Sequence, residues 1–150
     1  MKHLFFVRHG NSTSDKYGEH LSGRGQREME TLSALIKELA GENLYIVSSP
    51  EAVAIESAKV LAERLGVAQP EETMVLWSDG KHPEKVHEYL MERKDKASSL
   101  IAVSHLEVAQ KYLPYFLRNE LKQEGHTPKP ARGQMVHFNL EQRTYELLPR

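Results

Sequence analysis

The chain has 150 residues, of which 39% are hydrophobic and 27% are charged, a composition typical of one soluble globular domain with a single core. Lys and Arg total 20 against 21 Asp and Glu, so the charge balance gives no reason to expect nucleic acid or an anionic membrane as a partner. The chain has no cysteine, which excludes disulfides, thiolate metal sites and a cysteine nucleophile.

The N-terminal segment contains only a short apolar run, residues 4–7, which Arg8 and His9 close. A secretory signal needs a longer apolar core and a small-residue cleavage site. No other stretch approaches the length needed to span a membrane. We therefore expect a cytoplasmic protein in which residues 1–150 form one domain and this run is the first strand.

Short apolar runs alternate with longer amphipathic runs along the chain. The pattern predicts strands at residues 4–7, 44–47, 74–77 and 100–103, and helices at residues 22–39, 50–65, 83–93 and 106–121. Ser49 is a candidate helix N-cap with Pro50 at the first helical position, and Pro114 predicts a kink or a break. Residues 135–148 alternate apolar and polar side chains, which indicates a hairpin or two edge strands. The order predicts an α/β fold of three layers, a mainly parallel sheet with helices on both faces.

Three of the predicted strands end in polar residues that suit one bound anion. The first is followed by Arg8, His9, Gly10, Asn11 and Ser12, the second by Ser48, Ser49 and Pro50, and the fourth by Ser104 and His105. Ligands of open α/β sheets bind at the carboxyl ends of the strands. We therefore expect these residues to lie together.

Arg8 and His9 have the chemistry of a phosphoryl-transfer site. Arginine presents a planar fork of donors that matches phosphate oxygens. Histidine is largely uncharged near neutral pH and is then a competent nucleophile. Gly10 allows the backbone to come close, and the helices that follow Pro50 and His105 present free N–H groups to an anion. A lone histidine at a strand end is more often structural, so the prediction depends on the combination.

Four segments in register resemble the motifs of one known family. They are FFVRHGNS at residues 5–12, LSGRGQ at 21–26, SSP at 48–50 and VSH at 103–105. In order and spacing they resemble the histidine phosphatase superfamily, also called phosphoglycerate mutase-like, and most closely its short bacterial phosphohistidine phosphatases. The matches extend over about the first two-thirds of the chain.

The resemblance implies a phosphatase that works through a phosphohistidine intermediate, with no metal and no cofactor. His9 is the implied nucleophile, and Arg8 and His105 are the implied donors to the phosphoryl oxygens in the transition state. The implied remainder of the substrate pocket is Asn11, Ser12 and the backbone amides near Leu106.

The sequence departs from the family pattern at a second arginine. The family usually has one three residues after the proline that aligns with Pro50, and this chain has Val53. Loss of one clamp donor costs a few kcal/mol in the transition state unless another group replaces it. Arg24, Arg27 and Arg132 are candidate replacements, and Arg132 is the most interesting because its loop comes late in the chain.

A second departure concerns the general acid. Many members carry a glutamate just after the third strand, where this chain has Asp79. Asp79 is the predicted proton donor, with His82 and Glu84 as further options. A phosphohistidine substrate needs little help from an acid, because a protonated imidazole is a good leaving group. The departure therefore favours phosphohistidine over an alkyl phosphate ester.

These observations favour a phosphatase whose partner is a phosphorylated protein or a small phosphorylated substrate. The chain has no room for a capping domain, so we expect open strand ends, which suit a macromolecular substrate and make a mutase the weaker hypothesis. Val53 and the missing acid leave a second hypothesis, a non-catalytic module that binds phosphate or a phosphoprotein. The remaining histidines are expected at the surface or in packing positions: His3, His20, His87, His126 and His137.

Overall fold

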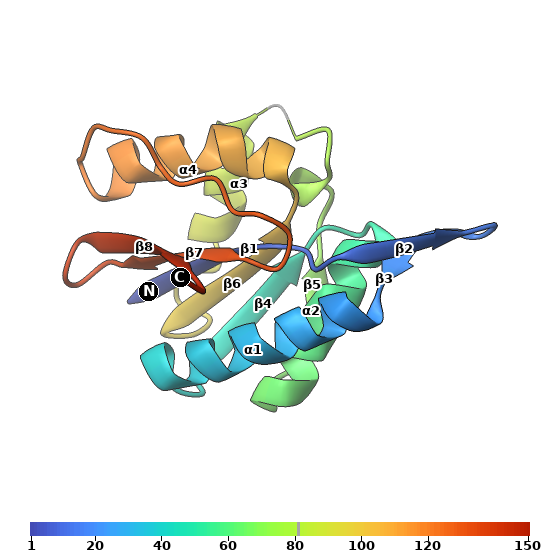
Figure 1. Cartoon of the computed structure of the whole chain (residues 1–150). Helices are drawn as coiled ribbons and strands as arrows, with labels where there is room; N and C mark the ends of the chain where they lie inside the picture. The colour runs from blue at the N-terminus through green and yellow to red at the C-terminus, as the bar shows by residue number, and fades with distance from the viewer. Residues whose placement is uncertain (81) are drawn as a thin grey trace.

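A computed structural model describes residues 1–80 and 82–150 of the chain. A six-stranded sheet in the order β5-β4-β6-β1-β7-β8 forms its middle layer (Figure 1). The strands are β1 (His3–Arg8), β4 (Leu44–Ser48), β5 (Glu71–Glu72), β6 (Ser99–Ser104), β7 (Met135–Asn139) and β8 (Thr144–Leu148). Strands β5, β4, β6 and β1 are parallel, and β7 and β8 are antiparallel. The fold is α/β with a mainly parallel sheet, as the sequence predicts.

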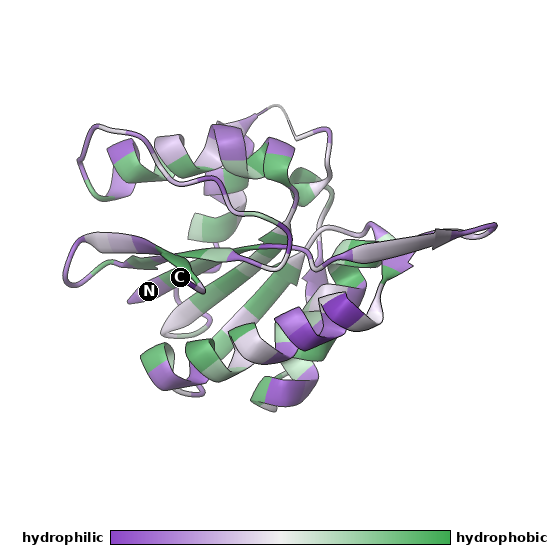
Figure 2. Cartoon of the chain, in the orientation of Figure 1, coloured by the Kyte–Doolittle hydropathy of each residue, from purple (hydrophilic) through white to green (hydrophobic). Residues whose placement is uncertain are grey.

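Helices cover both faces of this sheet. The helices α1 (Gly23–Ala40) and α2 (Ala52–Leu65) lie on one face, and α3 (Pro83–Met91) and α4 (Leu106–Glu120) lie on the other (Figure 1). Their apolar sides turn toward the strands, as the green inner surfaces in Figure 2 show.

Strand β1 shows why the sheet has two cores. Side chains of a strand alternate between faces, so Phe5 and Val7 pack among residues of α1 and α2, while Leu4 and Phe6 pack among residues of α3 and α4. All four side chains are fully buried. A strand buried on both faces reads as a continuous apolar run, and this is why residues 4–7 were recognisable in the sequence.

The third predicted strand, residues 74–77, is wrong. The structure has a short 3-10 helix at Met74–Leu76 after the two-residue strand β5. The Thr73 hydroxyl accepts a hydrogen bond from the Val75 N–H and caps this turn. Only Leu76 of the run is buried, and Met74 is 67% exposed, so the run does not have the burial of a central strand.

The segment between β1 and α1 also differs from the sequence-based prediction. The sequence pattern predicts no strand there, whereas the structure has the antiparallel hairpin of β2 (Ser12–Asp15) and β3 (Gly18–Leu21). This hairpin projects away from the main sheet (Figure 1). Its residues are mostly exposed and polar, so the sequence lacks the hydrophobic alternation from which strands are recognised.

Two predictions about helices need correction. Glu51 is the N-cap of α2 and Ala52 its first residue, so the start predicted at Ser49 and Pro50 is two residues early. Of the kink or break predicted at Pro114, the break is wrong, because α4 runs from Leu106 to Glu120 with Pro114 inside it, and the kink stays a prediction. In the part of the chain that the structure describes, no helix combines the length and the apolar character needed to cross a bilayer.

Candidate active site

The three predicted strand ends meet at one edge of the sheet. Strand β6 lies between β4 and β1, so the segments that leave these strands are neighbours. The His9 N–H donates to the Ser104 carbonyl at 3.1 Å, and the Ser49 N–H donates to the Val103 carbonyl at 3.0 Å. The parallel register of the strands therefore brings His9, Ser49 and His105 together from distant parts of the sequence.

His9 is held in a state suited to nucleophilic attack. Its Nδ1 lies 2.9 Å from the Gly10 carbonyl oxygen. Because a carbonyl can only accept, Nδ1 carries the proton and Nε2 keeps its lone pair. Burial lowers the pKa of His9, the bond to Gly10 opposes this effect in part, and the charges of Arg8 and Arg132 lower the pKa further. The ring is therefore neutral near pH 7, with Nε2 unprotonated.

His105 lies beside His9, with ring centres 5.3 Å apart and an interplanar angle of 65°. Both side chains are buried. His105 Nε2 lies 2.8 Å from Glu51 Oε2 and 2.9 Å from Ser49 Oγ. Burial lowers the pKa of His105, while the charge of Glu51 opposes this effect. His105 therefore lies beside His9, and its Nε2 is within hydrogen-bonding distance of the Ser49 hydroxyl with the Glu51 carboxylate close by.

Arg8 and Arg132 supply the positive charge of the site. Arg8 Nη1 donates to the Pro130 carbonyl at 3.2 Å, and its buried Nε has no hydrogen-bond partner among the described residues. Burial lowers the pKa of Arg8 and the charge of Arg132 lowers it further. The loop that carries Arg132 is fixed beside His9, because the Gly133 N–H donates to the His9 carbonyl at 3.0 Å.

The segment after His9 packs closely against the start of α1. A Cβ atom on Gly10 would lie 2.8 Å from the Gly25 carbonyl oxygen, and one on Gly25 would lie 2.2 Å from the Asn11 oxygen. Backbone atoms cannot move away as a flexible side chain can, so both positions require glycine. This contact fixes the direction in which His9 leaves β1.

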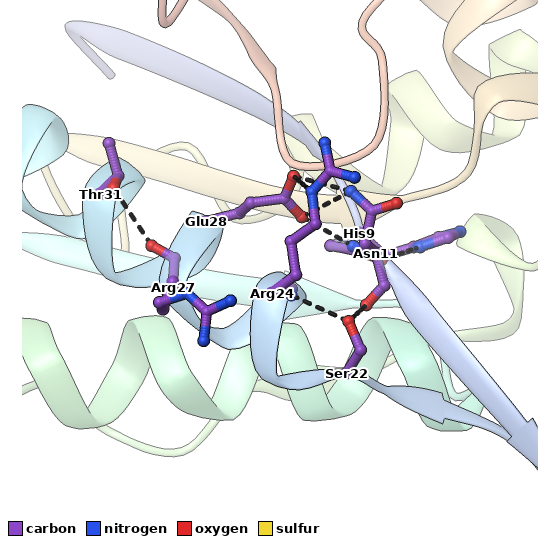
Figure 3. A network of polar contacts seen from close by, with 9 residues as sticks. His9, Asn11, Ser22, Arg24, Arg27, Glu28 and Thr31 are labelled. Carbon is purple, nitrogen blue, oxygen red and sulfur yellow. Dashed lines mark hydrogen bonds and ion pairs between the residues drawn. The ribbon is translucent and has the colours of Figure 1, made fainter.

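Asn11 is already bound by a carboxylate. Its backbone N–H donates to Glu28 Oε1 at 2.8 Å, and its side-chain amide donates to both Glu28 oxygens at 2.9 and 2.7 Å (Figure 3). Arg24 lies alongside, with Nε 3.8 Å from Glu28 Oε2. Two of the predicted site residues, Asn11 and Arg24, therefore belong to a network around Glu28.

Helix α2 contacts the segment after His9 through Ser57, and it has Val53 where the family usually has an arginine. The Ser57 hydroxyl accepts from the Gly10 N–H at 3.1 Å and donates to the Val53 carbonyl at 2.7 Å. Val53 itself is 4% exposed. Of the three candidate replacements for an arginine at position 53, Arg132 is the one whose charge acts on both Arg8 and His9. Arg27 lies on α1, and its Nη1 is 3.7 Å from the position that a Cβ atom on Gly23 would occupy.

The other predicted site residues lie around the edge of the sheet. Ser12 begins β2, and Leu106 is the first residue of α4, directly after His105. The first backbone N–H groups of a helix have no partner within it, so those of α4 remain available to an anion. Asp79 and His82 line a hollow of about 300 Å³ that also includes Trp77, and Glu84 is in the first turn of α3.

Three carboxylates near the histidine pair were missed from the sequence. Glu51 contacts His105, and its other oxygen accepts from the Ser78 hydroxyl at 2.6 Å. Glu19 of the hairpin acts on the pKa of both His9 and His105, and Glu107 acts on that of Arg8 and His105. For Glu51, the sequence offered one signal. The residue directly follows Pro50 and stands two residues before Val53, where the family usually has an arginine.

Among the described residues, no group of three or more His, Asp or Glu side chains is arranged to hold a metal ion.

Comparison with known proteins gives matches of structure. No family model and no curated protein sequence matches the chain. A structure of the protein histidine phosphatase SixA with tungstate is similar at a TM-score of 0.71 and 18% identity, over 97% of this chain and 93% of that one. A mycobacterial glucosyl-3-phosphoglycerate phosphatase with VO3 has a TM-score of 0.66 at 13% identity, over 100% and 99% of the chains.

A third similar structure is a phosphoserine phosphatase mutant from Entamoeba histolytica in complex with phosphoserine. Its TM-score is 0.63 at 12% identity, and the match covers 99% of this chain and 96% of that one. The fold predicted by the resemblance of the sequence motifs is therefore confirmed. The chain has the fold of the histidine phosphatases.

Proposed function

We propose that the protein is a phosphatase that transfers a phosphoryl group to His9 and then to water. The observation that carries the proposal is the state of His9, a neutral ring with its free Nε2 beside the guanidinium of Arg8. The substrate is a phosphohistidine in a protein or a small phosphate ester. The similarity in fold to a protein histidine phosphatase supports this proposal.

The reaction has two steps. In the first, His9 Nε2 bonds to phosphorus, and the bond from phosphorus to the leaving atom breaks with its electron pair going to that atom. In the second, water attacks phosphorus, the bond to Nε2 breaks, and inorganic phosphate leaves. Arg8 and Arg132 stabilise the negative charge on the phosphoryl oxygens, together with the N–H groups at the start of α4.

The leaving atom of an ester must also take up a proton. Asp79 is the donor predicted from the sequence, and Glu51 is the carboxyl group in contact with His105. A phosphoramidate such as phosphohistidine has less need of a donor, because its nitrogen is protonated before the bond breaks. Neither carboxyl group requires a metal ion for this role. The absence of cysteine fits a reducing compartment, and we propose that the protein acts in the cytoplasm.

A phosphoenzyme-trapping experiment tests the proposal. The protein is mixed with radiolabelled acetyl phosphate, quenched in alkali and examined for label that is stable to base and labile to acid, as phosphohistidine is. We expect label on the wild type and on His126→Ala, a change at an exposed histidine, and none on His9→Ala. Label that persists on His9→Ala would overturn the assignment of the nucleophile.

A second candidate function is a non-catalytic module that binds phosphate. Two observations favour it: Val53 in place of an arginine, and the carboxylate of Glu51 on His105. Such a module would bind inorganic phosphate but show neither a phosphoenzyme nor a burst of product. The trapping experiment and a phosphate titration of the same sample therefore separate the two functions.

A further inference from the structure

A hollow of about 490 Å³ adjoins the histidine pair on the β4 side of the sheet. Its lining includes Glu51 and Val53 at the start of α2, Tyr17 and Glu19 from the hairpin, and Trp77. The hollow lies next to the histidine pair, because Oε2 of Glu51, one of its lining residues, is 2.8 Å from His105 Nε2. A group attached to phosphorus at His9 would therefore extend into this hollow or border on it.

The charges around the site are separated along the edge of the sheet. Arg8 and Arg132 lie on the side of β1 and β7, whereas Glu51 follows β4. Glu19 adds a second negative charge that acts on both histidines. No basic residue is among the described residues that line the hollow. One side therefore suits the phosphoryl group, and the other repels an anion.

Glu51 is not used to cap its own helix. It occupies the N-cap position of α2, where an acidic side chain normally accepts from backbone N–H groups, but it makes no side-chain cap bond. Its two oxygens are instead bound to His105 and Ser78. These two contacts, both with residues outside α2, hold the carboxylate beside His105, so a purely structural role in the helix does not account for it.

We propose that this hollow is a subsite for a cationic leaving group, so that the preferred substrate carries an amine close to its phosphoryl group. The inference rests on the proposed phosphatase function. Carboxylates attract an ammonium group, and an indole ring such as that of Trp77 binds cations on its face. A leaving group with its own carboxylate would meet Glu19 and Glu51 and be repelled. Val53 is then the compatible residue, because an arginine there would compete for the same carboxylate.

Two small esters of opposite charge test the proposal. O-phosphoethanolamine and phosphoglycolate both place a charged group on a two-carbon chain, an ammonium in one and a carboxylate in the other. We expect the wild type to have at least about a tenfold higher kcat/KM for O-phosphoethanolamine, the effect of one charge-assisted contact. In Glu51→Gln the ratio should fall about fivefold or more. Equal ratios in the two proteins, or a wild-type preference for phosphoglycolate, would overturn the subsite.

A matched control lies on the same helix. Glu63→Gln removes an exposed carboxylate near the other end of α2, and the ratio should stay at its wild-type value. A fall as large as that of Glu51→Gln would mean that overall charge, and not the hollow, sets the preference, which also overturns the proposal.

The proposed activity is measured separately with p-nitrophenyl phosphate, whose turnover should depend on His9. If no ester is turned over, the phosphatase function fails, and calorimetric titration with the same two esters then tests the subsite alone. Tighter binding of O-phosphoethanolamine that weakens in Glu51→Gln would support the subsite. Equal binding of the two esters, or no binding of either, would overturn it.

Discussion

Strand β1 has a pair of contacting histidines near each of its ends, of which His9, His105 and His137 are buried and His3 is partly buried. At the amino end, His3 Nδ1 lies 2.9 Å from His137 Nε2, and the His137 ring stacks on Phe5 with centres 4.5 Å apart. At the carboxyl end, His9 lies against His105. Burial lowers the pKa of all four rings. Burial and a lowered pKa therefore do not by themselves distinguish a reactive site from a packed one.

The two histidine pairs differ in the groups that surround them. His137 lies between an aromatic ring and another histidine, whereas His9 lies beside Arg8, Arg132 and the N-terminus of α4. The second environment offers two guanidinium groups and the N–H groups of a helix start to a phosphoryl group. The comparison leads to four predictions about the two pairs.

Removal of His9, the proposed nucleophile, has the largest expected effect. His9→Ala should lower turnover of p-nitrophenyl phosphate roughly a thousandfold or more, because loss of a nucleophile removes the covalent route. Steady-state kinetics on a sample with an unchanged thermal melt measures this. Activity within tenfold of the wild type would show that the pair at the carboxyl end is no more reactive than the pair at the amino end.

Removal of the second arginine has a smaller expected effect. Arg132→Ala should lower kcat/KM about tenfold to a hundredfold, since a hydrogen bond to a charged group contributes roughly 1.5–3 kcal/mol. Arg24→Ala is the matched control, because Arg24 is paired with Glu28 and is mostly exposed. A larger loss in Arg24→Ala than in Arg132→Ala would place the second clamp residue on α1.

An arginine at position 53 should raise activity on small esters. In Val53→Arg we expect kcat/KM for p-nitrophenyl phosphate to increase on the order of tenfold, because the new guanidinium offsets Glu51 and supplies a phosphoryl donor. The same change should decrease the preference for O-phosphoethanolamine over phosphoglycolate. An unchanged rate in a folded variant would indicate that Arg132 already fills this place.

The sequence predicted the parts of the site that depend on strand register. Arg8, His9 and His105 follow apolar runs, and parallel neighbouring strands bring their ends together. The hairpin that carries Glu19 was not predicted, because its side chains are mostly polar and exposed. The false strand at residues 74–77 had the opposite cause, since its apolar residues suggested burial that only Leu76 has.

The contact of Glu51 with His105 could not be predicted from the sequence for a different reason. The residue type of Glu51 and its place beside Pro50 were visible, but whether its carboxylate caps α2 or reaches across to His105 depends on the distance between two strand ends. That distance is set by the packing of β4 against β6, and a single sequence does not contain it.

The pair at the amino end of β1 should affect stability in acid and leave turnover unchanged. Burial, with the neighbouring His3, lowers the pKa of His137 from 6.5 to about 4. The unfolded chain therefore binds more protons than the folded chain between these values, so the free energy of unfolding falls as the pH decreases from 6.5 to 4. A difference of one pKa unit between the folded and unfolded chain corresponds to about 1.4 kcal/mol. Protonation of His137 therefore lowers the free energy of unfolding by up to roughly 3 kcal/mol.

His137→Phe tests this role, because phenylalanine keeps the stacking on Phe5 and cannot be protonated. Urea unfolding at pH 6.5 and at pH 4 should show a smaller loss of stability in this variant than in the wild type, while kcat/KM at pH 7 stays the same. His126→Gln removes an exposed histidine and should keep the wild-type loss. If His137→Phe lost stability in acid as steeply as the wild type, the proton uptake would belong to other groups. If it lost turnover instead, the two histidine pairs would be coupled through β1, and the contrast between them would fail.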